Sequence, residues 1–153
     1  MAELTQQWIW EPMGAEHDAF WCTGKDRQAA AYFCFNASLR DWGRLGVMLA
    51  QDGQMGGRQI IPREYLVDAT DASRQPSAFR PYQATPFTGY GYQFWLHPFK
   101  ERTFVMQVVH GQAVYVQPAS GLVMVQTAVF AQDRKSTRLN SSHTDISRMP
   151  SSA

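Results

Sequence analysis

The 153-residue chain has only two cysteines, Cys22 and Cys34, and their spacing fits no metal or redox motif. We therefore expect both to be ordinary buried or half-buried thiols. The chain also lacks a strong charge of either sign, because its formal net charge is only +1. This balance gives no reason to expect nucleic acid or a membrane surface as a partner.

Long apolar runs are missing as well, and none approaches the length of a membrane span. Residues 1–8 lack the basic and apolar regions of a signal peptide, so a cytoplasmic and a periplasmic location both stay open. The sequence has no G-x-S-x-G elbow, no glycine-rich phosphate loop and no zinc signature. We accordingly expect no metal and no cofactor.

The residues that are present indicate a folded domain. Hydrophobic residues make up 44% of the chain and aromatic residues 13%, which argues against intrinsic disorder. Residues 103–130 are rich in Val, Phe, Tyr and Thr, as strands are, with breaks at residues 110–112 and 117–121. Together with residues 89–96 they predict four consecutive strands in an antiparallel sheet that helices cover on one face.

Three helices are expected before the sheet. Residues 3–10 form a short amphipathic pattern, and Pro62 suits the first turn of a helix that follows it. Ser38 and Asp41 resemble a capping box at the start of a third helix, to which we assign no chemistry. Between helix and sheet, residues 70–88 form a long proline-containing loop, and loops of this length are often functional.

The last residues, 133–153, change abruptly to a Ser-, Arg- and Thr-rich composition. They match the translation of a common short-read sequencing adapter on both sides of its variable index. We interpret them as an adapter-derived artefact, expect them to be disordered and exclude them from the domain. They hold four cations and two anions, so residues 1–132 alone carry a formal charge of −1.

Within residues 1–132, several segments stand in a recognisable order: I-W-E-P-M-G (9–14) with D-A-F-W (18–21), F-N-A-S-L-R-D (35–41), R-Q-I-I-P (58–62), G-Y-G-Y-Q (89–93) and H-G-Q-A-V-Y-V-Q-P (110–118). Together they resemble the C-terminal part of serine hydrolases related to class C β-lactamases, above all 6-aminohexanoate-dimer hydrolases and family VIII esterases. The resemblance implies a partial α+β, β-lactamase/transpeptidase-like fold, C-terminal portion only, with an antiparallel sheet and helices.

The same resemblance implies a mechanism in which the serine of S-x-x-K is acylated while its lysine and the tyrosine of Y-x-N move the proton. This chain contains neither motif and no K-T-G, so it provides no catalytic nucleophile or base. Only the edge-strand element has a counterpart, formed by Val109, His110, Gly111 and Gln112. There the backbone N–H of Val109 or of His110 would complete the oxyanion hole in the cleft wall.

The predicted site residues also have purely structural interpretations. His110 could be a strand-end histidine with a structural hydrogen bond. Tyr90 and Tyr92 could line the substrate cleft, although aromatic residues two apart in a strand more often belong to a core.

Three expectations follow from the resemblance. The parent protein acts on a small-molecule amide or ester, and the part that bears the nucleophile lies outside this chain. The chain alone has no esterase activity. It folds only marginally, because faces and edges meant for the missing part are exposed. The alternative is a non-catalytic binding or interaction module that uses the aromatic sheet and the 70–88 loop.

Overall fold

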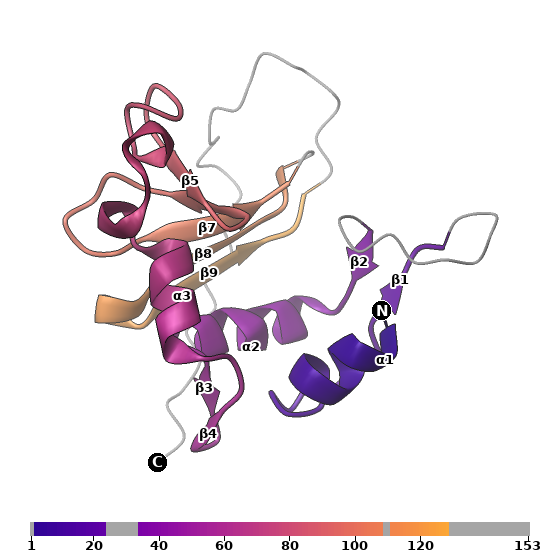
Figure 1. Cartoon of the computed structure of the whole chain (residues 1–153). Helices are drawn as coiled ribbons and strands as arrows, with labels where there is room; N and C mark the ends of the chain where they lie inside the picture. The colour runs from indigo at the N-terminus through magenta and orange to yellow at the C-terminus, as the bar shows by residue number, and fades with distance from the viewer. Residues whose placement is uncertain (1, 24–33, 109–110, 129–153) are drawn as a thin grey trace.

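The computed structural model describes residues 2–23, 34–108 and 111–128, and it contains helices and an antiparallel sheet as predicted (Figure 1). The segment interpreted as adapter lies outside these residues, so the division at residue 132 stays a prediction. In the described part of the chain, no helix is both long and apolar enough to cross a membrane.

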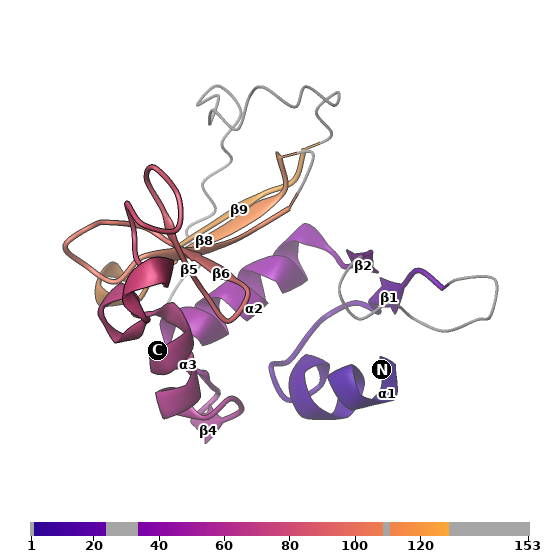
Figure 2. The same ribbon diagram turned by 45° about the horizontal axis from the view of Figure 1, so that its top comes forward.

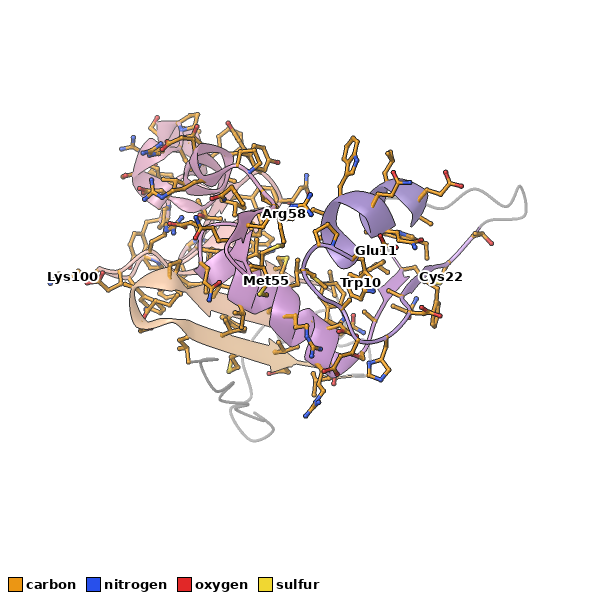
Figure 3. All side chains as sticks on the ribbon, turned by 90° about the horizontal axis from the view of Figure 1, so that it is seen from below. Trp10, Glu11, Cys22, Met55, Arg58 and Lys100 are labelled. Atoms are coloured by element: carbon orange, nitrogen blue, oxygen red, sulfur yellow. A yellow bond between two sulfur atoms is a disulfide. The ribbon has the colours of Figure 1, made fainter. Side chains whose placement is uncertain are left out.

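The N-terminal segment forms the predicted helix in two parts, α1 (Ala2–Thr5) and a π-helical turn, η1 (Gln6–Trp10). Two short strands follow, β1 (Phe20–Trp21) and β2 (Phe35–Asn36), which pair antiparallel. The Trp10 ring meets the Phe35 ring edge-on at 5.2 Å between centroids. Figure 3 shows Trp10 between this segment and the rest of the molecule.

The expectation of two ordinary thiols is wrong, because Cys22 and Cys34 form a disulfide with their Cα atoms 5.4 Å apart. The register of β1 and β2 explains the pairing. Trp21 lies opposite Phe35, so the next residues along the two strands also face each other, and the Cys22 N–H donates to the Cys34 carbonyl oxygen at 3.0 Å. Spacing in the sequence does not reveal this juxtaposition, since it depends on which strands pair.

Helix α2 (Leu39–Ala50) confirms the predicted capping signal. Ser38 is its N-cap, and the Ser38 hydroxyl accepts a hydrogen bond from the Asp41 N–H. A small hairpin follows, β3 (Gln54–Met55) and β4 (Arg58–Gln59), with Gly56 and Gly57 in its turn. Helix α3 (Arg63–Thr70) then begins directly after Pro62.

The sheet has five strands in sequence order, each antiparallel to the next. They are β5 (Gly89–Gly91), β6 (Phe94–Leu96), β7 (Phe104–Gln107), β8 (Ala113–Gln117) and β9 (Leu122–Gln126). The prediction of one strand over residues 89–96 is wrong. Tyr92 and Gln93 both have positive φ and form a two-residue turn that divides the segment into a hairpin.

The core lies between α2 and one face of this sheet (Figure 2). Alternate strand residues point to this face, as the two-residue period of a strand requires. Buried Leu49 of α2 and Leu66 of α3 belong to one cluster with Leu96, Phe104, Val114 and Val116 of the sheet. The helices therefore hold the sheet from one side, and the β7–β8 turn extends beyond the strands at one end.

Candidate functional site

The β7–β8 turn is where the sequence predicts the wall of an active site. Val109 and His110 lie outside the described residues, whereas Gly111 and Gln112 lie within them. Gly111 has φ of 81°, in the region that favours glycine, and its carbonyl oxygen accepts a hydrogen bond from the Gln126 side chain at 2.7 Å. The Val108 N–H donates to the Gln112 carbonyl oxygen at 3.0 Å and closes the turn. Gly111 is thus held by Gln126 of β9, and Gln112 by Val108 of its own hairpin.

Tyr90 lies on β5 beside Trp95, with 4.8 Å between the ring centroids, and its hydroxyl donates to Gln93 Oε1 at 2.9 Å. It lines an open cavity of about 320 Å³ under the 70–88 loop. The lining consists of Ala78, Phe79, Ala84, Thr85, Tyr90 and Trp95, and it is largely apolar. A cavity of this kind suits an apolar or aromatic group rather than an ion.

Tyr92 does not join Tyr90 in this cavity. It stands in the β5–β6 turn, is 56% exposed and lies 5.8 Å from the Tyr65 ring of α3. The turn interrupts the two-residue period of the strand, so Tyr90 and Tyr92 do not face the same cavity.

The structure also separates Tyr90 from the β7–β8 turn. Across the sheet Tyr90 is paired with Trp95, Trp95 with Val105, and Val105 with Tyr115. Three strand spacings amount to about 14 Å, and the turn lies beyond the end of the Tyr115 row. The described residues therefore do not unite the two predicted parts of the cleft.

The 70–88 loop is more ordered than its sequence suggests. It contains two 3₁₀ turns, η2 (Ala72–Arg74) and η3 (Ser77–Phe79). The Arg80 guanidinium donates to the carbonyl oxygens of Gln75 and Ser73, at 2.8 and 3.0 Å. These contacts hold the loop over β5 and shape the cavity.

A polar cluster around Asp41 joins the start of α2 to the N-terminal segment. The carboxylate is 0% exposed and accepts hydrogen bonds from the Glu16 N–H at 2.8 Å, the Ser38 hydroxyl at 2.7 Å and Arg44 at 3.0 Å. The His17 N–H adds a fourth contact at 3.2 Å. Because its lone pairs are occupied by protein donors, Asp41 is suited to holding structure and not to proton transfer.

An aromatic cluster that the sequence did not single out surrounds His97, just after β6. His97 is half-buried and stacks on Phe99 at 5.1 Å, with Phe87 at 5.7 Å and Tyr115 at 5.9 Å. In the described part of the chain its buried Nδ1 atom has no hydrogen-bond partner. Burial lowers the pKa of His97 below its ordinary value. The only sequence signal is the density of aromatic residues on either side.

We expect this lowered pKa to make folding pH-dependent. A histidine whose pKa is depressed in the folded state contributes full stability above its unfolded pKa of about 6.5, and that contribution is lost as pH falls through the folded value. Chemical unfolding at several pH values should show the free energy of unfolding decreasing below about pH 6.5. A His97→Phe variant should lose that part of the decrease, and an unchanged pH profile in the variant would contradict the assignment.

No family profile and no curated protein matches the sequence. The solved structure "Putative 6-aminohexanoate-dimer hydrolase from Bacillus anthracis" matches 81% of this chain with a TM-score of 0.71 at 24% identity. A second, "Crystal structure of putative beta-lactamase from Bacteroides dorei DSM 17855", matches 83% of it with a TM-score of 0.57 at 16% identity.

This chain spans 31% of the length of the first of these structures and 44% of the second. It has part of an α+β fold of the β-lactamase/transpeptidase type, with helices and an antiparallel sheet, which confirms the predicted fold class. At these identities the likeness concerns the fold, and the chemistry needs an argument of its own.

Proposed function

We propose that the chain is the C-terminal part of a serine hydrolase that cleaves a small-molecule amide or ester through an acyl-serine intermediate. The observation that carries the proposal is the match of 81% of the chain to a hydrolase structure of which it spans only 31%. The remaining length of such a protein has room for the S-x-x-K and Y-x-N elements that this chain lacks.

In this proposal the β7–β8 turn forms the wall of the cleft beside the substrate carbonyl that the serine attacks. The serine hydroxyl would add to that carbonyl while a base removes its proton, and negative charge would develop on the carbonyl oxygen. A backbone N–H of Val109 or of His110 would donate to that oxygen. The leaving amine or alcohol would depart with a proton, and water would then release the acid from the serine. The contacts of Gly111 and Gln112 support the proposal, because they hold the backbone on which the donor would depend.

We expect the chain alone to be inactive. Removing the nucleophile from a group of residues that act together costs about 10⁶-fold in rate, so hydrolysis of a p-nitrophenyl ester should stay at the buffer rate. A fluorophosphonate should leave the chain unlabelled. A well-characterised serine esterase would serve as a positive control for the assay, and burst release with stoichiometric labelling of this chain would refute the proposal.

A second candidate function is a non-catalytic binding module. The cavity lined by Phe79, Tyr90 and Trp95 favours it, because the 70–88 loop and the sheet together line an open, largely apolar hollow. The reading frame upstream of Met1 distinguishes the two. In-frame S-x-x-K and Y-x-N motifs there would support the hydrolase, whereas a stop codon and a promoter directly before Met1 would support the module.

A further inference from the structure

The Cys22–Cys34 disulfide lies at the end of the β1–β2 hairpin, beside the start of α2 (Figures 1 and 2). It joins two strands that are only two residues long each. A two-stranded hairpin is marginally stable in water, so the pairing of these strands depends strongly on the covalent bond.

The bond fixes the position of Phe35, which follows Cys34 directly and contacts three tryptophan rings. The distances between ring centroids are 5.2 Å to Trp10, 4.6 Å to Trp21 and 5.6 Å to Trp42. Trp10 belongs to the N-terminal segment and Trp42 to α2, so the Phe35 ring connects these two parts of the fold.

The surroundings of the two sulfur atoms suit thiol–disulfide exchange. Cys22 is exposed, so a small thiol can approach its Sγ atom, whereas Cys34 is half-buried. The Asn36 Nδ2 group lies 3.7 Å from each Sγ atom. An N–H donor stabilises a thiolate, and a more stable thiolate is the better leaving group. Attack at Cys22 therefore releases Cys34 beside a donor.

The backbone at Cys34 favours breaking of the bond. Its φ is 64°, a left-handed conformation that residues other than glycine adopt at a cost in free energy. The Cys34 carbonyl oxygen accepts from the Cys22 N–H and from Asn36 Nδ2, both at 3.0 Å, so the closed hairpin holds the residue there. Once the disulfide is broken, this backbone can relax. The fold therefore favours the bond less than an unstrained site would.

We propose that this disulfide is a redox switch that a small thiol of the glutathione class opens and closes. A thiolate attacks Cys22 Sγ, the S–S bond breaks, and Cys34 leaves as a thiolate. A second thiolate then attacks the sulfur of the first thiol in the mixed disulfide and releases Cys22. Two thiols are thereby oxidised to one disulfide, the two cysteines are reduced, and each cysteine thiolate takes a proton from water. Reduction frees β1 from β2 and lets Phe35 leave the three tryptophans.

The opening is confined to the hairpin. The N–H groups of Glu16 and His17 stay bonded to Asp41, so the N-terminal segment remains attached to α2 in both states. A reducing compartment with a glutathione pool opens the switch, and an oxidising one keeps it closed. The inference does not depend on the hydrolase proposal, because every contact that carries it lies in the described part of the chain.

Equilibration of the full chain with a fixed ratio of reduced to oxidised glutathione tests the switch. Alkylation and mass spectrometry give the ratio of oxidised to reduced chain, which is compared between native buffer and concentrated urea. The two cysteines are 12 residues apart, and closing such a loop in a rigid fold would favour the bond about 100-fold over the unfolded chain. Because the Cys34 backbone is strained, we expect about tenfold. Equal ratios in the two solvents, or a native preference of about 100-fold or more, would overturn the proposal.

Hydrogen exchange of the oxidised chain and of the chain reduced with dithiothreitol locates the opening. The Cys22 amide should exchange about tenfold faster after reduction, because its bond to the Cys34 carbonyl oxygen is lost. The His97 amide, bonded to the Thr103 carbonyl oxygen in the sheet, should not change. The double substitution Cys22→Ser with Cys34→Ser is the control for the reductant and should resemble the reduced chain in both buffers. A Cys22 amide that exchanges equally in both forms would exclude the switch.

Discussion

Asp41→Ala is expected to lower the free energy of unfolding by about 3–5 kcal/mol, enough to unfold a marginally stable chain. The substitution leaves several part-buried donors without their acceptor: the N–H groups of Glu16 and His17, the Ser38 hydroxyl and Arg44. An unpaired buried donor costs more than the hydrogen bond it had contributed. Loss of the near-ultraviolet circular dichroism signal and of a cooperative urea transition would be the measured result.

The pKa of Asp41 predicts how the stability that this carboxylate provides changes with pH. Burial by itself would raise the pKa of this carboxyl, but the hydrogen bonds from Ser38, the Glu16 and His17 backbone and Arg44 together hold it below the usual value. A carboxyl with a lowered folded pKa stabilises the protein above its unfolded pKa, and this contribution is lost as pH falls through the folded value. Acid should therefore destabilise the chain below about pH 4, and Asp41→Asn should weaken that dependence.

Two variants separate the carboxylate from the helix cap. Ser38→Ala removes one donor and the capping hydroxyl of α2, and it should cost about 1 kcal/mol. Asp41→Asn keeps the volume of the side chain and should fall between Ser38→Ala and Asp41→Ala. An Asp41→Ala chain that unfolds at the same urea concentration as the parent would show that the N-terminal segment does not depend on this cluster.

Gly46→Val should destabilise the chain by about 3 kcal/mol. A Cβ at position 46 of α2 would lie 2.4 Å from Val123 Cγ1 and 3.2 Å from Val114 Cγ1, so the helix would have to move off the sheet. Valine side chains are stiff at χ1 and relax poorly. The midpoint of thermal unfolding, followed by circular dichroism, measures the effect.

The control for this contact is a double-mutant cycle. Gly46→Ala alone gains about 1 kcal/mol of helix propensity, but we expect the clash with Val123 to outweigh that gain. Val123→Ala removes the clashing atom, so the two substitutions together should be less destabilising than the sum of the single effects. Simple additivity would show that α2 does not approach β9 as closely as the structure places it.

Much of the fold could be predicted from local signals. Ser38 and Asp41 marked the start of α2, and Pro62 marked the start of α3, because caps and prolines act on the residues next to them. The breaks around Gly111 and Gly121 could be predicted because glycine is the residue that most readily takes a positive φ, and both glycines have a positive φ in the structure. The division at Tyr92 was missed because two non-glycine residues take that conformation there.

The candidate site was less accessible to prediction. Gly111 and Gln112 occupy the expected turn, but Tyr90 and Tyr92 point to different surroundings, and the disulfide between Cys22 and Cys34 was not foreseen. Each of these depends on which strands pair and in which register. A register is decided by packing of whole faces and not by the residues at one position.

By itself the sequence determined the three helices, the antiparallel character of the sheet and the absence of S-x-x-K and Y-x-N, since these depend on residue type and short spacing. Only the tertiary structure decided that Asp41 is buried, that Tyr90 lines a cavity away from Gly111, and that Cys22 pairs with Cys34. The physical reason is the same in each case. Burial and pairing arise from contacts between residues distant in the chain, and a local pattern carries no information about them.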